Sequence, residues 1–377
     1  MNIPKLRFKD NNGNDYPQWE KKKLGDIVQF LDNKRKPLEQ SERIHGKYPY
    51  YGASGIIDYI NNYIFDEELV LLSEDGANII DRNYPICYIA TGKYWVNNHA
   101  HVLKTKSQYL NKFLCEALER LNYNKYNTGT AQPKLNQDIC KNILLNIPIL
   151  HEQEKIANFF STIDKKITNL ENTITSLENQ KKGLLQQIFS QKLRFKDKNG
   201  NNYPNWKKKK LGDLFTIKAG GDINKENFSE QYSIEFKYPV YANALTNNGL
   251  YGYSNIYKID KPSITVTGRG INVGFALSRE PFYYPIVRLL VLIPNININF
   301  TFFTESINFI HIFNESTGVP QLTAPQLSKV NVYVPNIEEQ NKIGNLFDKL
   351  NEKIDNKKAQ LEHWQQIKKG LLQQMFV

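Results

Sequence analysis

The chain has 377 residues, which is long enough for two or three domains with hydrophobic cores. A hydrophobic content of 40% with 12% aromatic residues argues against a disordered chain, and a net charge of +11 favours an acidic partner such as nucleic acid. A basic protein without a polyanionic partner is the alternative that charge alone leaves open.

Cysteine usage and the N-terminus exclude several classes of protein. The three cysteines (Cys87, Cys115 and Cys140) form no C-x-x-C pair, which fits a reducing cytoplasm and predicts neither a disulfide framework nor a zinc site. The N-terminus has no apolar segment typical of a signal peptide, and no apolar run reaches membrane length. We therefore expect a cytoplasmic protein with no membrane partner.

The first segment of the chain occurs twice. Residues 6–27 and 193–214 are identical at 17 of 22 positions, at an offset of 187. The same offset relates the KKGLLQQ segment at 181–187 to its copy at 368–374. The chain is therefore a tandem duplication. Between the matched blocks, the inserts at 28–127 and 215–316 have almost nothing in common, which suggests a device that recognises two different things.

The first insert has the pattern of a mixed α/β domain. Strands are predicted at 48–52, 69–73 and 84–91, followed by a helix near 107–121. A polar loop at 97–101 contains two histidines, but an H-x-H pair without a third ligand is a weak metal motif, and we expect no metal. Asparagine and basic side chains are the usual partners of DNA bases and phosphates. The candidate DNA contacts of this half are Ser54, Arg82, Lys93, Tyr94, Asn97, Asn98, His99, Thr130, Gln132 and Lys134. A polar surface loop is the alternative reading of 97–101.

A long helix is predicted next, because apolar residues follow steps of four and three from Ile156 to Leu177. The second copy has a weaker seam from Ile343 to Met375, in which Lys357 replaces an apolar residue. Each helix of about 36 residues would be about 54 Å long and needs a partner. We expect the two copies to form an intramolecular coiled coil; homodimerisation with a second chain is the alternative. Gly183 and Gly370, at equivalent places, indicate a close backbone approach, a docking surface or a local irregularity.

The second insert is predicted to contain strands at 237–243, 263–268 and 288–294 and a helix near 301–314. Its segment 268–274 has the spacing G-x-G-x-x-x-G, which does not match the dinucleotide-binding fingerprint. A glycine-rich loop that presents Arg269 and Asn272 to bases or phosphates fits better, with an ordinary tight turn as the alternative. The candidate DNA contacts of this half are Asn243, Thr246, Asn247, Arg269, Asn272, Arg288 and Gln321.

Catalytic motifs are missing from the sequence. It contains no N-P-P-Y or D-P-P-Y segment for amino-group methylation and no Walker A motif. It also lacks H-E-x-x-H and G-x-S-x-G. We therefore name no catalytic residue.

These features together resemble the specificity subunit of a type I restriction–modification system. The resemblance is carried by YPxWxxxxLGD at 16–26 and 203–213, and by the entry to each helix, IP…EQ-x-x-I, at 147–156 and 334–343. The T-G…L segment before each helix and KKGLLQQ at its end also match. The order of domain, helix, domain and helix spans the whole chain and is more specific than any one motif.

The resemblance implies an α+β fold, with two globular mixed α/β target-recognition domains separated by two long helices. The helices would pack as an intramolecular antiparallel coiled coil, so that the tandem repeat is pseudo-two-fold. The expected segments are the first target-recognition domain (1–150), the first spacer helix (151–191), the second target-recognition domain (192–336) and the second helix (337–377).

The resemblance also implies partners. Each domain would recognise one half of an asymmetric bipartite site in double-stranded DNA, and the chain itself would be non-catalytic. The helices would dock two modification subunits, with candidate docking residues Gly183, Leu184, Gly370 and Leu371. No cofactor is expected on this chain. S-adenosylmethionine is implied for the adenine-methylating modification subunits, and ATP and Mg for restriction subunits that translocate and cleave DNA. A stand-alone DNA-binding regulator and a nuclease with an unrecognised motif are the alternatives.

Overall fold

The computed structural model describes residues 4–105, 108–129, 131–310, 312 and 320–376. It divides into two compact units, residues 1–171 with 359–377 and residues 172–358. Each unit therefore contains one recognition insert and part of both long helices. The boundaries between the two units fall within the long helices. The sequence repeat instead predicts domain boundaries at the ends of these helices.

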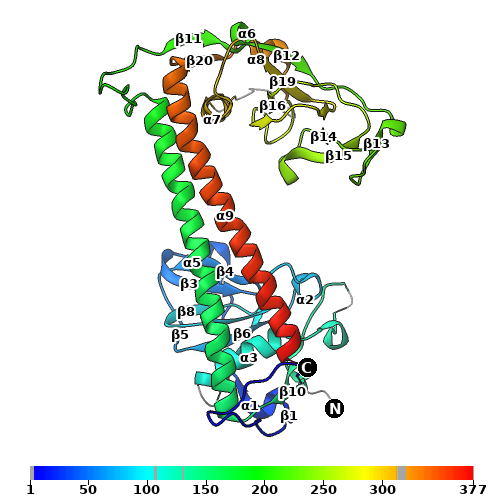
Figure 1. Ribbon diagram of the computed structural model, residues 1–377. Coiled ribbons are helices and arrows are strands. Elements are labelled where there is room, and N and C mark those ends of the chain that lie inside the picture. Colours follow the sequence, from blue (N-terminus) through cyan, green and yellow to red (C-terminus); the bar gives the residue numbers. More distant parts are fainter. Residues whose placement is uncertain (1–3, 106–107, 130, 311, 313–319, 377) are drawn as a thin grey trace. The chain divides into compact units, whose positions relative to one another are not determined.

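The first unit contains two four-stranded sheets (Figure 1). One has the order β2-β9-β6-β7, built from Val28–Phe30, Ala100–Thr105, Leu69–Ser73 and Cys87–Ala90. The other has the order β4-β3-β8-β5, built from Gly55–Ile60, His45–Gly52, Lys93–Val96 and Phe65–Asp66. Its helices are α1 (Leu24–Ile27), α2 (Asn78–Asp81), α3 (Gln108–Arg120) and α4 (Gln137–Lys141), with 3-10 turns at Asp32–Lys34, Gln40–Glu42 and Asn124–Tyr126.

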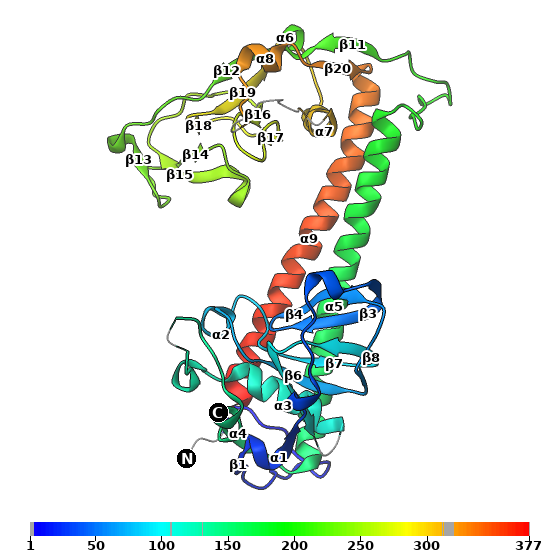
Figure 2. The same ribbon diagram turned by 180° about the vertical axis from the view of Figure 1, so that it is seen from behind.

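The second unit repeats the order of the first sheet and three strands of the second sheet, although the inserts differ in sequence (Figure 2). Its first sheet has the order β12-β19-β16-β17, built from Phe215–Ala219, Leu289–Pro294, Ser263–Thr267 and Ala276–Arg279. Its second sheet has the order β13-β15-β14-β18, built from Phe228–Ser229, Leu250–Ser254, Tyr238–Tyr241 and Tyr284–Pro285. Its helices are α6 (Leu211–Leu214), α7 (Phe300–Ile310) and α8 (Ala324–Ser328), with 3-10 turns at Lys225–Asn227 and Thr246–Gly249. The fourth strand of the second sheet differs, because β5 pairs with β8 in the first unit and β13 pairs with β15 in the second.

Burial on both faces explains the uninterrupted apolar run of β6. Val70 and Leu72 pack in the cluster that contains α3 residues, whereas Leu69 and Leu71 pack with Tyr94 and other residues of β8. Helix, sheet and sheet thus form successive layers, so the central strand has no solvent-facing side to encode as polar residues. The structure confirms the predicted strands at 69–73 and 263–267.

The repeated segments build the same frame in both units. Short strands pair antiparallel, β1 (Glu20–Lys23) with β10 (Leu144–Ile147) and β11 (Lys207–Lys210) with β20 (Asn331–Val334). Buried Glu152 accepts hydrogen bonds from Arg7 at 2.7 and 3.0 Å and from Trp19 at 3.0 Å. Glu339 accepts the equivalent bonds from Arg194, at 2.7 and 3.2 Å, and from Trp206 at 3.1 Å. The repeated motif residues are therefore explained by the frame itself.

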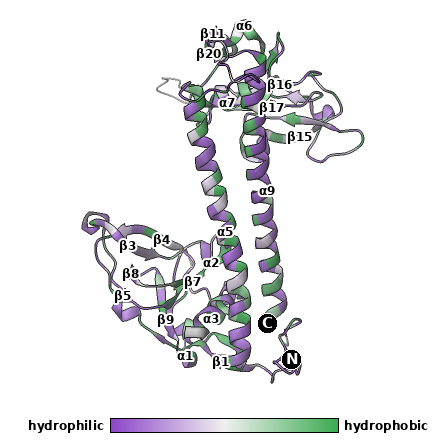
Figure 3. Ribbon diagram, turned by 60° about the vertical axis from the view of Figure 1, so that its left-hand side comes forward, coloured by the Kyte–Doolittle hydropathy of each residue, from purple (hydrophilic) through white to green (hydrophobic). Residues whose placement is uncertain are grey.

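The long helices are α5 (Leu150–Phe189, 40 residues) and α9 (Ile337–Met375, 39 residues). In the first unit, Phe160 near the start of α5 packs on Phe376, directly after α9, with ring centroids 6.0 Å apart. In the second unit, Phe189 at the end of α5 stacks on Phe347 near the start of α9 at 6.4 Å. The helices therefore run antiparallel within each unit. Figure 3 shows apolar residues recurring along both helices, as the predicted seam requires.

The predicted seam is buried at most of its positions. In α5 the fully buried seam residues are Ile156, Phe160, Ile163, Leu170, Ile174, Leu177 and Ile188. In α9 they are Ile343, Phe347, Ile354 and Met375. The weaker burial along α9 agrees with the polar interruption at Lys357. No helix in the described part of the chain is long and apolar enough to cross a membrane.

Candidate nucleic-acid interface

In the second unit, the glycine-rich loop after β16 is held by its own backbone and by Asn243. The Asn243 side chain accepts from the N–H groups of Gly268 at 2.6 Å and Arg269 at 3.2 Å. Its amide group donates to the Arg269 carbonyl at 2.8 Å. Asn243 therefore positions the loop, and its hydrogen-bonding groups are used within the protein.

Two glycines of this loop are required by its geometry. A Cβ atom at Gly268 would lie 2.5 Å from the Arg288 carbonyl oxygen, which is closer than real Cβ contacts allow. Gly270 has φ +91°, a left-handed conformation that favours glycine. The loop is thus a fixed platform and not a generic flexible turn.

The platform borders a cleft of about 380 Å³. The residues that line the cleft include four predicted DNA contacts, Asn243, Arg269, Asn272 and Arg288. Between two of them, Ile271 is 95% exposed. Neither guanidinium, of Arg269 or of Arg288, forms a hydrogen bond or ion pair with any residue that the structure describes. The cleft therefore presents two arginines, one asparagine and an apolar tip to solvent.

Two further predicted contacts lie in the adjoining turn, Thr246–Gly249. Thr246 and Asn247 are exposed there, and Asn247 and Asn248 have left-handed φ values of 50° and 51°. Buried Arg279 donates to the Asn248 carbonyl at 2.7 Å and stacks on Tyr241 at 3.8 Å from the ring centroid. Leu245, next to this turn, lines the cleft. The fold thus brings the predicted contacts of this half to one region.

The loop after β6 in the first unit is held by the same backbone bonds. In the second unit the three bonds are Gly268 N to Arg288 O (2.9 Å), Leu322 N to Gly268 O (2.8 Å) and Gly270 N to Pro320 O (2.9 Å). In the first unit they are Glu74 N to His99 O (2.9 Å), Leu135 N to Glu74 O (2.7 Å) and Gly76 N to Pro133 O (3.0 Å). Isolated bridges pair Asp75 with Lys134 and Arg269 with Gln321. Glu74, Asp75 and His99 therefore occupy the places of Gly268, Arg269 and Arg288.

The loop in the first unit is tied to a buried charge network. Glu74 lies 2.5 Å from Arg35 and 3.5 Å from Lys134. Arg35 also lies 3.5 Å from Asp32, and His101 lies 2.6 Å from Asp32. Glu74, Asp32 and His101 are close enough together to hold a metal ion, but both carboxylates are already paired with the Arg35 guanidinium, and Asp32 also with His101. The chemistry of the group is therefore that of an internal ion-pair network.

His101 is held as an imidazolium. Its Nδ1 lies 2.6 Å from an Asp32 carboxylate oxygen and its Nε2 lies 2.7 Å from the Leu135 carbonyl, so both ring nitrogens face acceptors. Burial lowers the pKa of His101, but the hydrogen bonds and charges of Asp32 and Cys140 together outweigh it and raise the pKa to about 10. Burial also raises the pKa of Asp32, but the hydrogen bond and charge of His101, the Val102 N–H and the Arg35 charge together lower it.

Asp75 faces solvent beside His99. The His99 Nδ1 lies 2.9 Å from both carboxylate oxygens of Asp75. His99 is about half exposed and Asp75 about one-fifth exposed by side chain. Where the second unit presents two arginines with no described partner, the first presents an acid paired with an imidazole.

Comparison with known proteins identifies the family to which this two-domain frame belongs. The model of the type I restriction modification DNA specificity domain matches residues 16–179 and again 203–364. The chain belongs to this family. Its function is DNA sequence recognition in a type I restriction–modification system.

Two relatives of this specificity chain match it over most of its length. A putative type I specificity subunit of Mycoplasma pneumoniae is 27% identical over 87% of this chain and 88% of its own. The MjaVIII specificity subunit of Methanocaldococcus jannaschii is 23% identical over 97% of this chain and 94% of its own. The crystal structure of a type I S subunit from M. genitalium has a TM-score of 0.72 at 19% identity and covers 99% of both chains. These similarities confirm the predicted family and its fold.

The predicted contacts of the first unit are only partly brought together. Asn97 and His99 flank the loop, because the Asn97 side chain accepts from the His99 N–H at 2.8 Å. Lys134 belongs to the same region through its bridge to Asp75. Ser54, Asn98 and Gln132 are exposed, and Thr130 lies outside the described residues.

Three predictions in the first unit need correction. Tyr94 is wrong as a DNA contact, because it is 0% exposed and lies in the hydrophobic cluster between the sheets. Asn97 is 4% exposed, so its side chain braces the loop instead of facing a ligand. Arg82 donates to the Glu119 carboxylate at 2.7 Å and to the Leu121 carbonyl at 3.1 Å, which makes it a structural residue. A fourth candidate, Lys93, is an exposed residue of β8 that lies 3.8 Å from Asp66, and its DNA contact stays a prediction.

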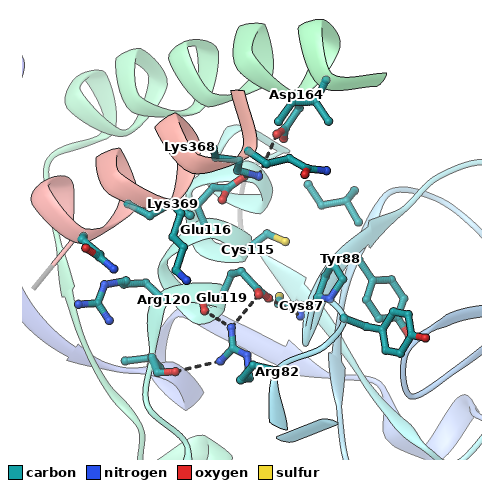
Figure 4. Close-up of a pocket in the computed structure, with 18 of the residues that line it drawn as sticks. Arg82, Cys87, Tyr88, Cys115, Glu116, Glu119, Arg120, Asp164, Lys368 and Lys369 are labelled. Carbon is teal, nitrogen blue, oxygen red and sulfur yellow. Dashed lines mark hydrogen bonds and ion pairs between the residues drawn. The ribbon is translucent and has the colours of Figure 1, made fainter. Parts of the chain in front are cut away.

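Lysines of the two KKGLLQQ segments contact buried glutamates of the recognition domains. In the first unit, Lys368 of α9 lies 3.0 Å from Glu116 of α3 and 2.8 Å from Asp164 of α5 (Figure 4). In the second unit, Lys181 of α5 lies 2.6 Å from Glu305 of α7. Figures 1 and 2 show α3 beside the end of α9 within the first unit. Each segment therefore fixes a long helix to a recognition domain.

The docking candidates divide into two kinds. Leu184 and Leu371 are partly buried and pack against the cores of the second and first units. At Gly183 and Gly370, an added Cβ would meet nothing within 4 Å, so of the three interpretations of these glycines the structure does not support a close backbone approach within the described residues. The glycines leave an open face on each helix, and docking at that face remains a prediction.

Sequence reasoning missed Asp75, Glu74 and Arg279. Asp75 and Glu74 are acidic, whereas basic and amide side chains are the usual partners of DNA. A signal was nevertheless present, since Leu135 and Leu322 are 187 residues apart and bond to equivalent loop residues. Arg279 had no comparable signal, because its role depends on contacts made only in the folded domain.

Proposed function

We propose that this specificity chain recognises an asymmetric bipartite site in double-stranded DNA, with one half of the site contacted by each recognition domain. The observation that carries the proposal is the pair of equivalent loops. The same backbone bonds hold a basic loop in one domain and an acidic loop in the other. Because the frames are alike and the loops differ, the two half-sites should differ in sequence.

We further propose that the chain performs no chemistry and acts with partner subunits in the cytoplasm. Two modification subunits would dock on the long helices, with Gly183 and Gly370 marking open faces for them. Adenine methylation with S-adenosylmethionine would then belong to the modification subunits. Translocation and cleavage with ATP and Mg would belong to restriction subunits.

Methylome sequencing tests both parts. Cells that express this chain with its modification subunit should gain adenine methylation within one bipartite motif, whereas cells with the chain alone should gain none. Methyl transfer by the purified chain would contradict the non-catalytic role. Binding of the chain to DNA without capture of a modification subunit would instead support a stand-alone regulator.

A domain exchange tests the independence of the halves. Replacement of residues 28–127 by the insert of a relative should change one half of the methylated motif and leave the other half unchanged. If both halves changed together, the domains would not be independent recognition units.

A further inference from the structure

We infer that Arg269 and Arg288 recognise a guanine in the half-site contacted by the second domain. The inference rests on the proposed bipartite DNA recognition and names the base chemistry of one of its halves. It also explains why the two half-sites differ. Arg269 of the second domain is structurally equivalent to Asp75 of the first, and Arg288 is equivalent to His99.

The fold fixes the backbone at Arg269 and Arg288, while both guanidinium groups can still bind a ligand. Asn243 fixes the backbone at Arg269, and the Arg288 carbonyl is fixed by Gly268 at 2.9 Å. Arg288 itself has φ 71°, a left-handed conformation that is costly for an arginine. Strain of this kind is typical of functional sites, where the surrounding structure holds a side chain in one required place.

In the first domain, the acidic residues at this place are paired with groups of the same domain. There, Asp75 is paired with His99 at 2.9 Å, and Glu74 is paired with Arg35 at 2.5 Å. In the second domain no acidic residue is among those that line the cleft. Two like charges beside one cleft repel each other, and an acceptor bound there would relieve this repulsion. A ligand that carries paired acceptors is therefore complementary to the cleft.

A phosphate alone does not fit this cleft well. Glycine-rich phosphate loops use free backbone N–H groups. Here the N–H groups of Gly268, Arg269 and Gly270 already donate to Arg288 O, Asn243 Oδ1 and Pro320 O. These three N–H groups are therefore not available to a ligand, and the charged groups that face the cleft are the arginine side chains. Planar arginine forks, an exposed asparagine and the 95% exposed Ile271 are the groups expected at base edges.

Guanine is the base that this set favours. Its major-groove edge carries two acceptors, O6 and N7, which match the two parallel donors of a guanidinium. The acid at the equivalent position of the first domain, Asp75, can instead accept from an exocyclic amino group. The two domains would then differ in base preference because of side chains carried by one shared platform.

The test uses the specificity chain in complex with its modification subunits. The variants are Arg269→Gln, Arg288→Gln and the charge-conserving Arg269→Lys and Arg288→Lys. Lys218→Gln, which removes an exposed positive charge from β12 of the same unit, is the matched control. Base preference is measured by binding to DNA libraries randomised in one half-site at a time, so the readout survives a loss of methylation.

We expect Arg288→Gln and Arg269→Gln to reduce discrimination for guanine at one position of the second half-site by about tenfold or more, with the first half-site unchanged. The lysine variants should also lose this discrimination, because a point charge cannot form the paired bonds. Lys218→Gln should at most weaken binding to all sequences alike. Hydrogen exchange in the second unit, compared with that of the wild-type chain, shows whether each variant is folded there.

Three outcomes would overturn the inference. Uniformly weaker binding with unchanged base preference would place the arginines on phosphates, and a salt dependence reduced by about one charge would accompany it. Full retention of discrimination by all four variants would show that the arginines contact no base. Relaxed preference for a base other than guanine would assign the wrong ligand. In each case the wild-type complex would still recognise a bipartite site, so the proposed function would stand; failure of the wild-type complex to do so would reject that function separately.

Discussion

The frame and the recognition loop differ in how they changed after the duplication. Glu152 and Glu339 each bind an arginine and a tryptophan at equivalent positions of the repeat, at nearly the same distances. The loops after β6 and β16 keep the same backbone bonds, but one carries Asp75 and the other Arg269. In this fold, the residues that hold the loop in place are therefore different from the residues whose side chains determine what the loop contacts.

The largest expected effect lies in the frame. Replacement of Glu152 by alanine should destabilise the first unit by about 3–5 kcal/mol, because it leaves Arg7 without its buried partner. Glu339→Ala should cost the second unit about the same, since Arg194 then loses the equivalent partner. Hydrogen exchange followed by mass spectrometry measures the two units separately.

The surface variant Glu20→Ala is the control for the frame. Glu20 pairs with Lys22 on an exposed strand, and such pairs contribute little to stability. A large difference between Glu152→Ala and Glu339→Ala would mean that the frame contacts are not equivalent, despite their matching geometry.

The next largest effect is the pH dependence of stability, which should differ between the two units. The pKa of His101 is raised from 6.5 in the unfolded chain to about 10 in the folded first unit. Its stabilising contribution is therefore complete below about pH 6.5 and is lost as the pH rises towards 10. The change should amount to a few kcal/mol, because each pKa unit corresponds to about 1.4 kcal/mol.

Hydrogen exchange at a series of pH values, with correction for intrinsic exchange rates, measures this effect. The first unit should lose protection between neutral and alkaline pH, and His101→Asn should remove most of that pH dependence. The second unit has no described counterpart of this network at Gly268, so it should show no comparable slope. Equal slopes in the two units would contradict the assignment of the alkaline loss to His101.

A smaller effect concerns specificity in the first domain. Asp75→Asn keeps the shape of the side chain but replaces one acceptor oxygen with a donor group. We expect discrimination in the first half-site to change by about 1–3 kcal/mol, with the second half-site unaffected. Binding to libraries randomised in each half-site checks this. An effect confined to overall affinity would show that Asp75 acts on the loop and not on a base.

The sequence allowed the architecture to be predicted because its signals were periodic or repeated. The seam from Ile156 to Leu177 and the buried strand 69–73 are patterns of period and run length, and both were found as expected. The shared topology of the inserts was not visible, since a common fold can be built from different apolar residues. It lies in the matching backbone bonds of the two units.

The candidate site was less predictable, because side-chain roles depend on burial and partners. Tyr94 follows the charged Lys93 and was taken for a surface residue, yet β8 is covered on the side where Tyr94 points. Asn243 was predicted to contact DNA, but its amide completes the loop backbone. The leucines of KKGLLQQ were predicted to face a partner and instead pack against the cores of their own chain.

The smallest expected effect concerns the helix glycines, which are the same in both copies. Glycine inside a helix is less stable than alanine by about 1 kcal/mol, and a Cβ at Gly183 or Gly370 would meet nothing within 4 Å. Gly183→Ala and Gly370→Ala should each therefore stabilise the chain by up to about 1 kcal/mol, measured by denaturant unfolding.

These glycines persist in both copies even though alanine would improve the helices, which points to a requirement outside the chain. If modification subunits approach these open faces, each alanine variant should be more stable but assemble less well with a modification subunit in a titration. Asn179→Ala, at an exposed position of α5, should improve helix propensity without affecting assembly. Full assembly by both glycine variants would remove Gly183 and Gly370 from the docking surface. The contacts of Lys181 and Lys368 and the packing of Leu184 and Leu371 would then account for the repeated segment.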